Sequence, residues 1–263
     1  MTREIVHVAI APPDRLEANL IEKVAAIVNK DLYGTRRLLV GKIPRIIAHC
    51  ETMQIAESTA LSLRALGLVA VVCTDSELRK SSQSYRAHAL KFEKGVVIFW
   101  DKSGQTKRTE AKDVFLIIKG MMRTYTEEEV TSTKMKFSLP ATVLTGGIPI
   151  WRRVKEKTKD KSLQTECFVR LYDRMSPEPR VDILEYDLDY SLLGTEMSSS
   201  SLANFNTIVA KIRDKFPQAV FDDRLIEPFE VDIPSTVPWG SIEINCRLIY
   251  LCHQVMSNRG SSV

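Results

Sequence analysis

Residues 1–80 alternate between short apolar runs and segments with helical spacing. Three strands are predicted by the apolar runs at 5–10, 44–49 and 68–73. Three helices are predicted where apolar residues recur every three or four positions, over about 15–28, 32–40 and 53–66. Gly41 and Gly67 follow the second and third helical segments, where glycine commonly ends a helix. The predicted order is strand, helix, short helix, strand, helix, strand.

The pattern changes after a polar segment at 80–85, which we interpret as a domain boundary. Strands are then predicted at about 87–92, 96–100, 105–109, 114–122, 166–172 and 181–186. Residues 125–137 are expected either to extend the strand at 114–122 or to pair with it. Helices are predicted at 202–216 and, within a C-terminal extension at 221–263, at 242–256. The sequence therefore predicts an α+β protein. A small N-terminal α/β sandwich (1–80) precedes a mostly antiparallel β domain (85–220) that ends in a helix.

Short segments of the N-terminal part carry a resemblance to known folds. They are Glu22-Lys-Val-Ala-Ala-Ile27, Thr35-Arg-Arg-Leu-Leu-Val40, Lys42-Ile-Pro44, Ile55-Ala-Glu57 and Leu63-Arg-Ala-Leu-Gly67. With the element order above, residues 1–80 resemble the C-terminal domain of the large ribosomal stalk protein and the adaptor of the Clp protease. The resemblance implies a small α/β module that docks on other proteins.

The contact residues of those families are not reproduced. The lysine-rich helix of the stalk domain is represented only by Arg36 and Arg37, and the Asn-Asp pair of the adaptor is replaced by Ala11-Pro-Pro-Asp14. For residues 85–220, strands followed by one helix resemble the pleckstrin-homology-like barrel in element order. An open α+β sheet is the alternative.

Length and composition are ordinary for a globular protein: 263 residues, 44% of them hydrophobic and 27% charged. No apolar run reaches the length that spans a bilayer, and Glu4 and His7 interrupt the first segment where an export signal would be apolar. The five cysteines form no Cys-x-x-Cys pair, which favours reduced thiols. We therefore expect a cytoplasmic protein.

Charge is concentrated in residues 134–161, which carry eight Lys or Arg and two acidic residues. This stretch has a net charge of +6, whereas the whole chain has +4 and residues 164–263 have −6. The stretch also holds an apolar run, 137–151, interrupted by proline and glycine. We expect its basic residues to be neutralised either by the acidic C-terminal part or by an external anion. Its apolar residues would be covered by the protein's own sheet, by a membrane or by a partner.

Within this stretch, glycine N–H groups and nearby cationic side chains suit an anion or partner contact. The candidate residues are Gly146, Gly147, Trp151, Arg152, Arg153 and Lys155. A nucleic acid is the alternative ligand of the same stretch, with Trp151 available for base stacking.

Two acidic runs have the paired carboxylates that catalysis or metal binding would use, Glu185 to Asp189 and Asp222 with Asp223. We interpret both as solvated faces. His7 and His49 fall in strands expected to be neighbours, but two imidazoles do not complete a metal site. The sequence thus predicts no catalytic residues, metal or cofactor. It favours a non-catalytic protein-binding or adaptor-type protein; an enzyme with a non-local site, drawn from Asp187, Asp189, Asp222 and Arg224, is a further alternative.

Overall fold

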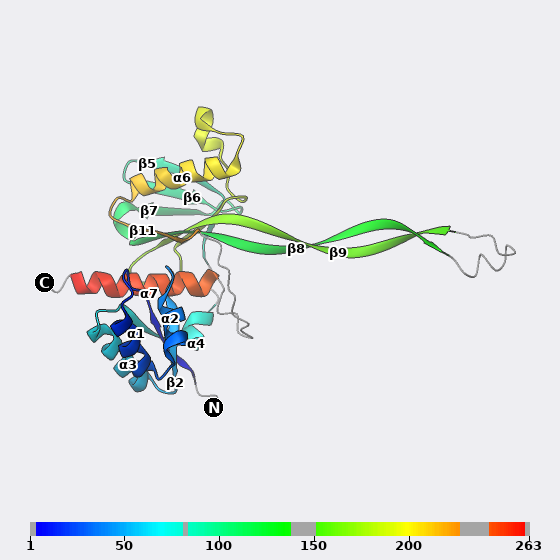
Figure 1. Ribbon diagram of the computed structural model, residues 1–263. Helices are drawn as coiled ribbons and strands as arrows, with labels where there is room; N and C mark the ends of the chain where they lie inside the picture. Colours follow the sequence, from blue (N-terminus) through cyan, green and yellow to red (C-terminus); the bar gives the residue numbers. More distant parts are fainter. Residues whose placement is uncertain (1–3, 81–83, 138–150, 227–241, 261–263) are drawn as a thin grey trace. The chain divides into compact units, whose positions relative to one another are not determined.

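The computed structural model describes residues 4–80, 84–137, 151–226 and 242–260, with the backbone path alone for 123–137, 151–164 and 259–260. The chain divides into two compact units (Figure 1). One comprises Met1–Met121 and Cys167–Val263, and the other Met122–Glu166.

The N-terminal part is built on a three-stranded antiparallel sheet with the order β2-β1-β3. Its strands are β1 (Val6–Ile10), β2 (Arg45–Cys50) and β3 (Ala70–Thr74). Its helices are α1 (Ala18–Val28), α2 (Leu32–Leu39), α3 (Met53–Ala65) and α4 (Asp75–Arg79). Strand alternation sends Val6, Val8 and Ile10 to one face, where they pack with buried residues of α1, α2 and α3.

Local sequence signals fix where these helices begin. The Asp31 side chain accepts a hydrogen bond from the Gly34 amide at 2.7 Å and caps α2, and Thr52 caps α3 in the same way. Thr74 and Glu77 form a reciprocal capping box at α4, a helix that the hydrophobic pattern did not predict. The first helix begins at Ala18, later than predicted, and Glu17 at its N-cap makes no side-chain capping hydrogen bond.

The last helix, α7 (Ile242–Gly260), covers the other face of this sheet. Its buried residues Ile244, Leu248 and Cys252 pack against Ala9, Val71, Cys73 and Leu78. On α7, Tyr250 also lies 5.6 Å from Tyr172 and 6.0 Å from Phe115 between ring centroids. The helix therefore contributes to the packing of the N-terminal sheet and of strands from the rest of the unit.

Two further sheets and a helix enclose the second part of the core. The three-stranded antiparallel sheet contains β5 (Ala89–Glu93), β6 (Val96–Trp100) and β7 (Thr106–Glu110). The five-stranded sheet has the order β11-β8-β9-β10-β4, with strands β11 (Val220–Leu225), β8 (Leu116–Phe137), β9 (Trp151–Tyr172), β10 (Val181–Leu184) and β4 (Arg86–Ala87). Helix α6 (Ser201–Lys215) buries Phe205, Ile208 and Ile212 in this core. The described residues also include two 3-10 turns, η1 (Ala111–Asp113) and η2 (Ser191–Glu196).

The α+β class is confirmed, and the elements from β1 to β3 follow the predicted order, to which the structure adds α4. The five-stranded sheet is mixed, however, because β4 runs parallel to β10 and β11 runs parallel to β8. Strands β8 and β9 are each 22 residues long, and they are hydrogen-bonded neighbours (Figure 1). Strand β8 ends at Phe137, as the extension of the 114–122 strand predicts, whereas β9 begins at Trp151, well before the strand predicted at 166–172. The domain boundary near residue 80 stays a prediction.

Candidate functional site: a basic hollow on α2

The predicted anion site lies largely beyond what the structure specifies. Gly146 and Gly147 fall outside the described residues. Trp151, Arg152, Arg153 and Lys155 belong to the first five residues of β9, for which the backbone path alone is described. A contact through these residues therefore stays a prediction.

The acidic run from Glu185 to Asp189 is not a solvated strand face, so that interpretation was wrong. Strand β10 ends at Leu184, and the chain then turns, which breaks the expected alternation. Glu185 is buried and accepts hydrogen bonds from the Cys167 amide and the Ser201 hydroxyl. Asp187 forms a salt bridge with Lys102.

The second acidic run contains another buried carboxylate. Asp222 is only 5% exposed, because it lies on β11 beneath α7, where His253 Nε2 approaches Asp222 Oδ2 at 2.7 Å. Arg224 donates from Nε to the same carboxylate at 3.0 Å. Burial would raise the pKa of Asp222, but the hydrogen bonds from His253 and Arg224 outweigh it and hold that pKa well below its usual range. The expectation of a solvated face is wrong for Asp222, and the carboxylate is already enclosed by its partners.

His7 and His49 are neighbours, as predicted, and they stand opposite each other across the β1–β2 pair. Their Nδ1 atoms lie 2.8 Å apart, and His7 Nε2 lies 3.3 Å from Asp75 Oδ1. Within the described part of the chain, no group of three or more His, Cys, Asp or Glu side chains is arranged to hold a metal ion. The five cysteines are free and buried.

A hollow of about 380 Å³ lies on α2 and the loop that follows it, and it was not predicted from the sequence. Its lining residues are Tyr33, Arg36, Arg37, Val40, Gly41 and Arg45. The first four occupy positions i, i+3, i+4 and i+7, which share one face of a helix. The opposite face carries the buried residues Thr35 and Leu39. This polar-side stripe of an amphipathic helix is the sequence signal that could have located the site.

Arg45 is the first residue of β2, eight residues after Arg37, and its side chain also lines the hollow. Its Nη1 atom donates to the Arg37 carbonyl at 2.8 Å. Gly41 adopts φ of +119°, a conformation that favours glycine, and a Cβ added there would lie 3.4 Å from Arg45 Nη2. The glycine therefore lets the Arg45 guanidinium lie close to the backbone. Arg224 Nη1 holds the next residue of the loop through the Lys42 carbonyl at 3.1 Å.

Three neighbouring guanidinium groups, those of Arg36, Arg37 and Arg45, make the hollow positively charged. Burial, and then the charge of Arg37, lower the pKa of Arg45 from its ordinary value. No carboxylate of the described residues lies within 4.0 Å of the charged groups of Arg36 or Arg37. The Arg37 guanidinium lies 6.0 Å from the centre of the Tyr33 ring, and Tyr33 is 72% exposed. The hollow thus combines positive charge with accessible apolar surface.

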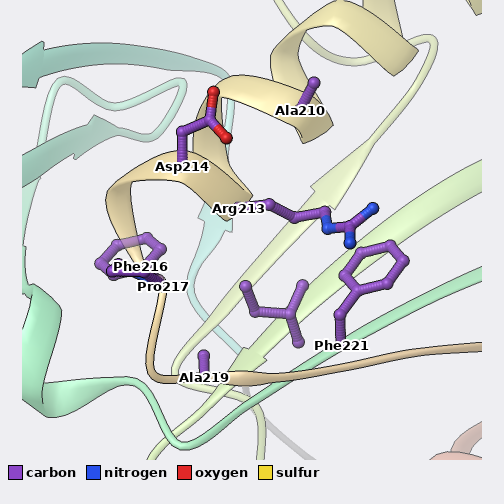
Figure 2. Close-up of a pocket in the computed structure, with 8 residues that line it drawn as sticks. Ala210, Arg213, Asp214, Phe216, Pro217, Ala219 and Phe221 are labelled. Atoms are coloured by element: carbon purple, nitrogen blue, oxygen red, sulfur yellow. The ribbon is translucent and has the colours of Figure 1, made fainter.

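Two other hollows carry a weaker signal. One, of about 440 Å³, lies at the end of α6, where the Arg213 guanidinium stacks 4.0 Å above the Phe221 ring (Figure 2). The neighbouring Asp214 lines it too. The other, of about 550 Å³, has Lys102 paired with Asp187 and Lys107 donating to the Arg180 carbonyl. Both hollows are lined by acidic as well as basic residues, whereas the charged residues lining the α2 hollow are all arginines.

No protein-family model, curated protein or solved structure matches this chain. Among the described residues, no helix has the length and apolar character needed to cross a membrane. The resemblance of residues 1–80 to the stalk domain and the protease adaptor therefore rests on the sequence pattern and element order alone.

Proposed function

We propose that the chain is a non-catalytic binding protein, and that the α2 hollow contacts an acidic segment of a partner protein. The observation that carries this proposal is the stripe of Tyr33, Arg36 and Arg37 on one exposed face of α2, continued by Val40 at the C-cap and joined by Arg45. Tyrosine and arginine are the residue types that most often dominate the energy of protein interfaces.

The charges and the exposure of the hollow both support this function. The exposed guanidiniums of Arg36 and Arg37, which have no nearby carboxylate among the described residues, favour a negatively charged partner and would speed its association. Tyr33 and Val40 are 72% and 50% exposed, so they offer apolar area that a partner can cover. A mixed basic and apolar surface suits a protein segment better than a simple ion.

A second contact, through residues 134–161, remains part of the proposal. Its support is the local net charge of +6, and it would bind an anionic surface or, as the alternative, a nucleic acid. Five free, buried cysteines agree with a reducing compartment such as the cytoplasm.

The α2 contact is tested with the full chain and two degenerate dodecapeptide libraries, one biased toward Asp and Glu and one toward Lys and Arg. We expect the protein to retain the acidic library, and Arg36→Glu with Arg37→Glu to abolish that binding. The matched control is Lys94→Glu with Arg108→Glu, which makes the same charge change at exposed positions elsewhere. Equal retention of the acidic library by both double variants would refute the α2 contact.

A further inference from the structure

The α2 hollow brings three guanidinium groups to one small concave surface. Arg36 and Arg37 come from the last turn of α2, and Arg45 comes from the start of β2. We infer that this hollow recognises a phosphorylated serine or threonine side chain of the partner protein, an inference that rests on the function proposed above.

A phosphate ester fits this charge better than a carboxylate does. At neutral pH it carries about −1.5 to −2 charges and three strong acceptor oxygens, whereas a carboxylate carries a single charge and two oxygens. Guanidinium groups form paired N–H···O bonds with phosphate oxygens, and clusters of arginine are a recurring means of binding phosphorylated segments. A dianion would relieve the mutual repulsion of Arg37 and Arg45 more completely than a monoanion.

The arrangement is also pre-organised. The Arg45 guanidinium is held at the Arg37 carbonyl and against Gly41, so part of the ordering needed for binding is already present. Arg45 is half-buried, and a charge-assisted hydrogen bond is stronger where water is partly excluded. A phosphate seated here would therefore meet a fixed donor beside the two more exposed guanidiniums of Arg36 and Arg37.

The surroundings of the hollow indicate a protein source for the phosphate. Leu32, Tyr33 and Val40 are exposed apolar residues of α2 and its end, and residues flanking a phosphorylated side chain could pack on them. An eight-residue helix is only about 12 Å long. That length is short for the extended basic groove with stacking platforms on which single-stranded nucleic acids usually bind.

Three degenerate dodecapeptide libraries, identical except for a central Ser, Glu or phosphoserine, test the inference with the full chain. At physiological salt we expect the phosphoserine library to bind at least tenfold more tightly than the Glu library, and the Ser library to bind most weakly. Arg36→Gln with Arg37→Gln should remove this preference, whereas Lys94→Gln with Arg108→Gln should keep it. Tyr33→Ala should weaken binding of all three libraries but leave the ratio between phosphoserine and Glu unchanged.

The outcomes separate this inference from the proposed function. Equal binding of the Glu and phosphoserine libraries, both lost in Arg36→Gln with Arg37→Gln, would overturn the phosphate inference and leave an acidic protein contact. Failure of every library to bind would overturn both. Inorganic phosphate is the competitor: if it displaces the phosphoserine library at concentrations equal to those of the peptides, the hollow binds free phosphate and the assignment to a partner protein is wrong.

Discussion

His7 and His49 share a hydrogen bond across neighbouring strands, with their Nδ1 atoms 2.8 Å apart. One Nδ1 must donate and the other must accept, so the pair requires at least one ring to be neutral there. His7 is fully buried and its Nε2 atom faces Asp75. Protonation of both rings would break this bond within the sheet.

Because of this histidine pair, we expect the folded protein to lose stability in mild acid. Burial lowers the pKa of His7, although Asp75 opposes the shift. Burial, and then the charges of His7 and Lys30, lower the pKa of His49. The unfolded chain therefore takes up these protons first, near pH 6.5, and unfolding is favoured as the pH falls from there toward the folded-state pKa values.

Urea unfolding at pH 7.5 and pH 5.5 measures this effect. We expect the wild type to unfold at lower urea at pH 5.5, and the difference between the two pH values to shrink in His49→Gln. That variant removes one of the two titrating rings while leaving Asp75 and Arg79 near His7. An identical difference in the variant and the wild type would show that the pair does not control acid stability.

Asp222→Asn should destabilise the protein by about 3 kcal/mol, because it leaves Arg224 and His253 partly buried without their carboxylate. The neighbouring Asp223 lies on the same strand but is exposed, so Asp223→Asn is the matched control and should change stability by less than about 0.5 kcal/mol. Chemical unfolding monitored by circular dichroism provides both values. Comparable losses in the two variants would contradict the role assigned to Asp222.

Leu248→Ala should cost about 2 to 5 kcal/mol, because Leu248 on α7 is buried against the N-terminal sheet. Met256 on the same helix is 37% exposed, so Met256→Ala should have a much smaller effect on the urea midpoint.

The sequence also predicts that residues 1–80 fold alone. Because α7 covers Val71 and Leu78, such a fragment should unfold at lower urea than the full chain; a fragment of equal stability would refute this.

Regular periodicity made some elements predictable. The strand at 96–100 and the helix at 202–216 have strong alternation or helical spacing, and the structure places them at Val96–Trp100 and Ser201–Lys215. The length of β9 was not predictable from apolar runs, because paired strands satisfy each other's backbone hydrogen bonds whatever side chains they carry. The acidic residues of β11 hid that strand, since Asp222 is buried through partners distant in sequence.

Only part of the α2 hollow could be predicted from the sequence. Tyr33, Arg36, Arg37 and Val40 recur at helical spacing, so their common face follows from the helix prediction. Arg45 joins them because β2 begins beside the end of α2, a tertiary relationship that local periodicity does not encode.

At Gly120 on β8, the side chains of neighbouring strands leave no room for a Cβ atom. A Cβ added there would lie 2.6 Å from Phe168 Cζ and 2.7 Å from Leu225 Cβ. Phe168 comes from β9 and Leu225 from β11, which pairs with β8 at this position. Gly120→Ala should therefore destabilise the protein by about 1 to 3 kcal/mol through overpacking.

Phe168→Leu tests the cause of that loss. The substitution alone should destabilise the protein, because Phe168 is fully buried, but it also removes the ring atom nearest to the added methyl group. Combined with Gly120→Ala, it should cost less than the sum of the two single changes, since the shorter side chain relieves the clash. Urea unfolding of the four proteins gives the coupling free energy. Strict additivity would mean that the Gly120 substitution acts through the backbone and not through contact with Phe168.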